Sequence, residues 1–216
     1  MQGKLRGGLI ALMSVIWLSG LSLAASDAPT EFIRQTTDSI FRVFGEPHLQ
    51  AAAQREERLA RLQYIANTAF DWEEIARRAL AMHWHERTPQ ERQEFAELFR
   101  EAVQGMYLQR LEAAAHERLR EKPAIRYVGE QVDGQRAMVR TTVVTTRRRE
   151  VPIDYRLCHT DEQWRVYDIV IMGVSLVNNY RIQFQRIITQ SSYEELVRQL
   201  KARQLGAVFE APQTSR

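Results

Sequence analysis

Residues 164–184, WRVYDIVIMGVSLVNNYRIQF, constrain the fold more than any other part of the chain. The first half of this segment alternates with a period of two, which indicates a β-strand. One face carries Trp164, Val166, Asp168 and Val170, and the other carries Arg165, Tyr167, Ile169 and Ile171. Gly173 interrupts the strand, and helical spacing follows at Val174, Leu176, Val177, Tyr180 and Phe184. Because both faces of the strand carry apolar side chains, both faces must be buried against other parts of the protein. This predicts that the following helix folds back over a curved sheet.

The chain before residue 112 shows the helical spacing of apolar residues. We expect helices over residues 29–44, 48–65, 71–81 and 88–111. The clearest start is Thr88-Pro89-Gln90-Glu91, where a cap residue precedes Pro at the first helical position and Glu at the third. Asp71 and Glu74 form a similar capping box for the helix before it.

The second half of the chain changes to a period of two. Strands are expected at 125–132, 137–146, 151–157 and from 164, with an Asp133-Gly134 turn between the first pair. Three short connections in succession predict an antiparallel meander. A helix from about Tyr193 to Arg203 follows. The expected fold class is α+β, with N-terminal helices packed on a curved antiparallel sheet of about four strands, and C-terminal helices.

The N-terminus has the pattern of a secretory signal peptide over residues 1–24. Lys4 and Arg6 precede an apolar run from Leu9 to Leu18, and small side chains occupy positions 22 and 24. We expect cleavage after Ala24, a single domain over 25–204 and a flexible tail over 205–216. The alternative is a membrane anchor, because residues 9–25 approach the roughly 17 residues that can span a bilayer.

Charge and cysteine content narrow the function classes. Without Lys4 and Arg6, 28 basic residues remain against 27 acidic ones, a formal net charge of +1. This balance gives no strong field for a polyanion, so we expect no nucleic-acid partner. Cys158 is the only cysteine, so no disulfide can form within the chain.

Several residues are of types that carry chemistry. His83, His85 and Glu86 could hold a metal, but no second His or Cys cluster completes a ligand shell, and a corner between two helices is the simpler interpretation. Cys158 is followed by His159, which would point to the opposite face of a strand and could not activate it.

Two carboxylates and one run of arginines remain. Asp154 and Asp168 lie on expected strands and could do acid–base work, although each is better explained as a partner of a neighbour such as Arg156 or Tyr155. Residues 147–149 are three arginines at an expected hairpin tip, either a solvated loop or a contact for an anion. We therefore expect no catalytic residues, no metal and no enzyme activity.

Four blocks of the sequence resemble the MlaC (toluene-tolerance) family of periplasmic phospholipid-binding proteins in the Mla lipid-transport pathway. They are FDWEEIARRAL at 70–80, TPQERQEFAELFREAV at 88–103, VPIDYRL at 151–157 and WRVYDIVIMGVSLVNNYR at 164–181. They occur in the family's order. The three arginines depart from the family's pattern, which more often has a turn with Gly at this place.

The resemblance implies a periplasmic carrier without a cofactor, whose cargo is phospholipid held in an apolar pocket. It implies two partners, an outer-membrane lipoprotein complex and an inner-membrane ABC transporter assembly of Mla type, each met by transient docking. With the strand alternation, it leads us to expect a lipid-binding site made of Phe99, Met106, Tyr107, Val143, Ile153, Tyr155, Ile171 and Val174. Two alternatives stay open: an enzyme on a cone-shaped α+β fold that uses Asp154 or His83, and a periplasmic adaptor that binds no ligand.

Overall fold

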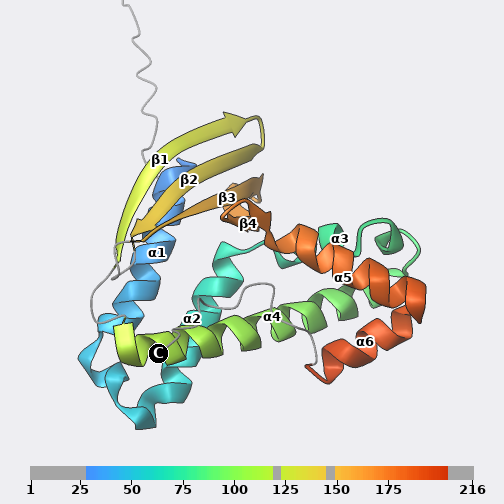
Figure 1. Ribbon diagram of the computed structural model, residues 1–216, viewed down its shortest axis with the longest axis horizontal. Coiled ribbons are helices and arrows are strands. Elements are labelled where there is room, and N and C mark those ends of the chain that lie inside the picture. The colour runs from blue at the N-terminus through green and yellow to red at the C-terminus, as the bar shows by residue number, and fades with distance from the viewer. Residues whose placement is uncertain (1–27, 119–122, 145–148, 204–216) are drawn as a thin grey trace, which may run out of the picture.

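The N-terminal half of the protein is helical. The computed structural model describes residues 28–118, 123–144 and 149–203, so the expected signal peptide, the tail and Arg147 and Arg148 lie outside the described residues. In chain order the helices are α1 (Pro29–Gly45), the 3₁₀ turns η1 (Pro47–Gln50) and η2 (Ala52–Gln54), α2 (Arg55–Ala69), α3 (Trp72–Leu80), the 3₁₀ turn η3 (Ala81–Trp84) and the long α4 (Pro89–Arg118). Figure 1 shows α4 crossing the lower half of the view, below the sheet.

Local capping fixes where the helices begin. Thr88 and Glu91 form the predicted reciprocal box: the Glu91 N–H donates to Thr88 Oγ1 at 3.2 Å, and the Thr88 N–H donates to Glu91 Oε2 at 2.7 Å. Asp71 caps α3, where its Oδ1 accepts the Glu74 N–H at 2.9 Å. The Glu74 side chain instead binds Arg77 and Arg78.

The second predicted helix was wrong in its bounds. It was expected over 48–65, but α2 begins at Arg55 and continues to Ala69. The two 3₁₀ turns before it bury Leu49 completely, and the Arg58 guanidinium donates to the Leu49 carbonyl oxygen. Burial of this one side chain overrides the helical tendency of the segment.

The sheet is an antiparallel meander of five strands in chain order. The strands are β1 (Ala124–Asp133), β2 (Arg136–Val144), β3 (Glu150–Thr160), β4 (Gln163–Ile171) and the short β5 (Val174–Ser175). Gly134 with φ of 55° and Gly173 with φ of 82° occupy turns that need the left-handed conformation. Then α5 (Leu176–Gln190) and α6 (Tyr193–Lys201) close the chain. The expected α+β class is confirmed, with β5 as the additional strand.

A β-bulge in β4 corrects the predicted alternation of its side chains. Arg156 pairs with Asp168, but Leu157 pairs with Val166, so Tyr167 is the extra residue. The expected faces were therefore wrong beyond this point. Ile169 packs with Val166 and Tyr155 in one apolar cluster, whereas Tyr167 and Asp168 both line a groove elsewhere.

The largest part of the core lies among α3, α4, α5 and α6. Its centre is a group of aromatic rings, in which the Phe99 ring lies 5.0 Å from both Tyr180 and Phe184, and Phe95 lies 5.7 Å from Phe184. A second cluster joins α1 to the sheet through Ile33, Val139 and Leu157. Among the described helices, none is both long and apolar enough to cross a membrane.

Candidate functional site

An apolar cavity of about 340 Å³ lies between the helices and one face of the sheet. Helices α1, α2, α3 and α4 line it on one side, strands β3 and β4 line it on the other, and α5 also contributes to its lining. Its main apolar lining residues are Ile33, Ile40, Leu62, Ile65, Phe99, Val103, Leu108, Val166, Ile169 and Ile171. The volume falls within the range of about 300–1,000 Å³ that is typical of ligand pockets.

Polar groups in the cavity are few and uncharged. None of the described residues that line it is Asp, Glu, Lys, Arg or His. Gln104 donates to Asn67 at 2.8 Å from Nε2 to Oδ1. Burial raises the pKa of Tyr155 to about 12 and raises that of Tyr180 further, so both phenols stay protonated. Such a cavity can hold an apolar ligand, and its hydroxyl groups can hydrogen-bond to a neutral polar group.

Four of the eight expected site residues line this cavity. They are Phe99 and Tyr107 from α4, Tyr155 from β3 and Ile171 from β4. The residues from α4 and those from the sheet face one another across the cavity.

The other four expected site residues do not line the cavity. Met106 packs against the aromatic core among α3–α6. Ile153 pairs with Ile171 across the strands and is half-buried, as is Val143 on β2. Val174 lies in β5 with 43% of its surface exposed. Its helical spacing was misleading, because α5 begins only at Leu176.

Sequence reasoning missed the contribution of the first two helices. Ile33 and Ile40 from α1, and Leu62 and Ile65 from α2, form much of the cavity wall. Their amphipathic spacing is visible in the sequence, but the same spacing is found in helices that pack against a solid core.

Asp168 has a structural role that accounts for its burial. Its carboxylate accepts hydrogen bonds from Ser175 Oγ at 2.7 Å, the Val177 N–H at 3.1 Å and Arg156 Nη1 at 3.1 Å. It thereby anchors the start of α5 to the sheet. Its negative charge also interacts favourably with the positive end of the α5 dipole. The predicted partnership with Arg156 is confirmed. Asp154 does not line the cavity.

The other chemical candidates are not brought together. His83 Nδ1 lies 3.2 Å from Glu86 Oε2 at the corner formed by η3, outside the cavity. Within the described ranges, no three His, Cys, Asp or Glu side chains converge on a point that could hold a metal. Burial raises the pKa of the Cys158 thiol, and the His159 ring packs against Trp164 at 4.9 Å instead of approaching that thiol.

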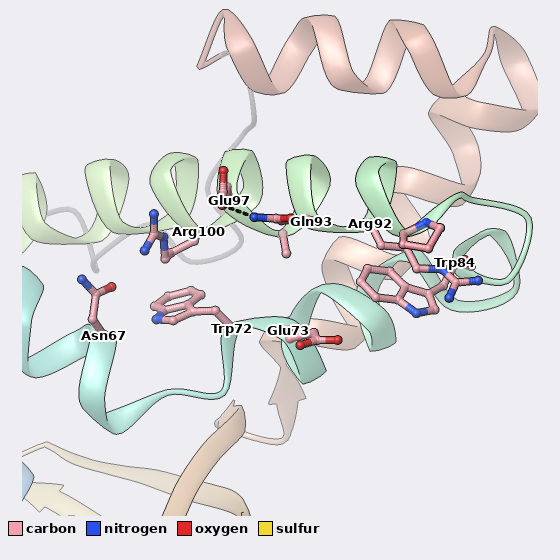
Figure 2. A pocket seen from close by; sticks show the side chains of 10 residues that line it. Asn67, Trp72, Glu73, Trp84, Arg92, Gln93, Glu97 and Arg100 are labelled. Atoms are coloured by element: carbon pink, nitrogen blue, oxygen red, sulfur yellow. Dashed lines mark hydrogen bonds between the residues drawn. The ribbon is translucent and has the colours of Figure 1, made fainter. Parts of the chain in front are cut away.

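A second hollow of about 560 Å³ lies on the outside, between α3 with η3 and the first half of α4 (Figure 2). It is lined by two tryptophans, Trp72 and Trp84, and by charged residues of both signs. Trp72 lines the internal cavity as well, so its indole ring separates the two spaces. Its Nε1–H donates to the Ala66 carbonyl oxygen at 3.2 Å, which fixes the ring in that position.

Helices packed on one face of a curved antiparallel sheet, with an apolar cavity between the two layers, define an α+β protein with an internal pocket for an apolar ligand. The chain belongs to the MlaC protein family, whose model matches residues 34–202. A solved structure with the same fold is that of a phospholipid-binding protein from Ralstonia solanacearum in complex with a phospholipid. The two chains are 24% identical with a TM-score of 0.66, over 82% of this chain and 96% of that one. No curated protein matches the sequence closely enough to count as a relative.

Proposed function

We propose that this protein is a periplasmic carrier that binds phospholipid and has no catalytic step. The acyl chains occupy the apolar cavity, and the headgroup faces solvent. The observation that carries this proposal is a cavity between the layers of an MlaC-family fold, in which no lining residue from the described part of the chain is charged. The phospholipid complex of the Ralstonia solanacearum protein supports the same class of ligand.

The residues proposed to contact the acyl chains are Phe99, Tyr107, Tyr155 and Ile171, together with the α1 and α2 side chains opposite them. Apolar groups contribute most of the binding energy, at about 0.8 kcal/mol for each buried methylene. Two acyl chains of about 30 carbons together would represent roughly 25 kcal/mol of transfer free energy when fully buried, and a cavity of about 340 Å³ must widen to enclose them.

This energy determines how the cargo must move. A carrier cannot release such chains into water at a useful rate, so the lipid must pass from one apolar site directly to another. We propose that the protein docks in turn on an outer-membrane lipoprotein complex and an inner-membrane ABC transporter assembly of Mla type. The periplasmic location also requires cleavage after Ala24, which N-terminal sequencing of protein from an envelope fraction would test.

Extraction of the purified protein with organic solvent, followed by mass spectrometry, tests the central proposal. Co-purified phospholipid near one molecule per chain is the expected result. An enzyme using Asp154 or His83 would turn over an added substrate, yet neither residue lines the cavity. An adaptor without ligand would yield no lipid even after incubation with phospholipid vesicles, and that outcome would refute the carrier.

A further inference from the structure

A groove rich in arginine lies between the end of α3, the start of α5 and strands β2–β4. Its volume is about 910 Å³, and it is open to solvent. The arginines that line it are Arg77 and Arg78 from α3, Arg136 from β2, Arg156 from β3 and Arg181 from α5. These segments are far apart in the sequence, and the fold brings their positive charges to one groove.

Carboxylates neutralise only part of this charge. Glu74 pairs with Arg77 and Arg78 at 2.7 and 2.6 Å, and Asp168 pairs with Arg156 at 3.1 Å. Asp168 is the single acidic residue among the described residues that line the groove. Asp71 lies near Arg77 as well, so five guanidinium groups stand against three carboxylates and the groove keeps a net positive charge.

Exposed apolar side chains lie among these arginines. Met82 is 63% exposed and Val174 is 43% exposed, and both line the groove. Ile182, which is 61% exposed, joins Met82 in a neighbouring shallow hollow of about 520 Å³ that Arg181 and Arg186 also line. Large apolar side chains that gather at an exposed place commonly mark an interaction site.

We propose that this basic–apolar surface, made of Met82, Val174, Ile182, Arg136, Arg181 and Arg186, docks the protein on a membrane that contains anionic phospholipid. Arginines attract the negative lipid surface, and apolar side chains beside them enter the boundary between headgroups and acyl chains. Both features occur here, and together they match the arrangement of basic and apolar side chains by which proteins bind the surface of an anionic membrane.

The position of this surface suits a carrier. Val177 lines both the arginine groove and the internal cavity, so one side chain separates the docking surface from the proposed lipid site. The role of this surface in lipid delivery rests on the proposed function. Membrane binding itself is a separate property, because it needs no lipid in the cavity.

Sedimentation with phospholipid vesicles tests the docking surface. The wild-type protein should bind vesicles that contain phosphatidylglycerol and phosphatidylcholine, and should bind pure phosphatidylcholine much more weakly. Arg136→Gln with Arg181→Gln should lower the partition coefficient about 25-fold, from about fivefold for each basic residue near an anionic surface. Raising the salt concentration to about 0.5 M should weaken wild-type binding in the same way, because exposed charges are screened.

Two further variants complete the test. Met82→Ser with Ile182→Ser should lower binding at least tenfold at every salt concentration, because it removes the apolar contribution. The matched control is Arg42→Gln with Lys201→Gln, which removes two exposed positive charges outside this surface and should bind as the wild type does. All variants carry the same N-terminus, so differences between them arise from the substitutions.

Three outcomes would overturn the proposal. The first is equal binding of the wild type to anionic and neutral vesicles. The second is a loss of vesicle binding in the control variant as large as that in the arginine variant. The third is a loss of vesicle binding in the arginine variant but none in the variant of Met82 and Ile182. The last would show that the apolar side chains do not enter the membrane, so the contact would be electrostatic alone and not the basic–apolar surface proposed. Lipid content measured on the same preparations keeps the two proposals apart, because protein that carries phospholipid yet fails to sediment refutes only the docking surface.

Discussion

Replacing Ile171 by Trp should exclude phospholipid from the cavity while leaving the fold intact. Ile171 lies at the end of β4 and lines the cavity, which has a volume of about 340 Å³. It is partly exposed and belongs to neither of the main buried clusters, so a larger side chain can extend into the cavity without displacing the aromatic core.

The size of the effect follows from the number of methylene groups displaced. Trp has about six more non-hydrogen atoms than Ile, and in a cavity of this size they displace about six methylenes of an acyl chain. At about 0.8 kcal/mol each, the loss is about 5 kcal/mol. This corresponds to roughly three to four powers of ten in affinity.

The assay is the molar ratio of phospholipid to protein after purification, measured by extraction and mass spectrometry. Thermal unfolding of the same samples checks that the variant is folded. Val132→Trp is the control, because Val132 also lies on a strand, is 51% exposed and lines neither the cavity nor the arginine groove. A folded Ile171→Trp protein with the lipid content of the control would show that this cavity is not the lipid site.

Three predictions concern stability. Asp168→Asn should lower the free energy of unfolding by about 2 kcal/mol in urea titrations, because it weakens the charge-assisted hydrogen bonds that hold the start of α5 and removes the partner of the half-exposed Arg156; an unchanged midpoint would contradict this role. Burial opposes ionisation of Glu74, but hydrogen bonds from Arg77 and its neighbour outweigh it and lower its pKa from 4.5. The stability gained from this carboxylate is therefore complete above pH 4.5 and is lost as the pH falls below it, and Glu74→Gln should unfold with a weaker dependence on acid pH. The pKa of Tyr155 is raised from 10.0 to about 12, so the wild type should lose stability between these values as the pH rises, and Tyr155→Phe should lose less, because the raised pKa values of Tyr180 and Tyr193 still contribute.

Sequence reasoning predicted most of the elements because their signals are local. A helix start such as Thr88 to Glu91 depends on hydrogen bonds that span three residues, and the structure shows both of them. The alternation of β3 likewise depends on neighbouring residues alone. These patterns were sufficient for the α+β class and for the sequence of helices and strands.

The candidate site was predicted only in part, because a cavity is not a local property. Ile33 and Leu62 lie on apolar helical faces whether such faces enclose a space or fill it. The Tyr167 bulge shifts the pairing of β4 by one residue, and this single insertion decides which side chains of the strand reach the cavity. No composition rule predicts where such a residue will be inserted.

The amino-acid sequence by itself determined the element types, the caps that begin the helices, the antiparallel meander and the resemblance to the MlaC family. Only the tertiary structure decided that the cavity lies between α1, α2, α4 and the sheet, and that arginines from four distant segments share one groove. The physical reason is the distance along the chain over which each interaction acts. Capping and strand alternation depend on residues that are neighbours in the sequence. A cavity and the net charge of a groove depend on surfaces that meet only after the chain has folded.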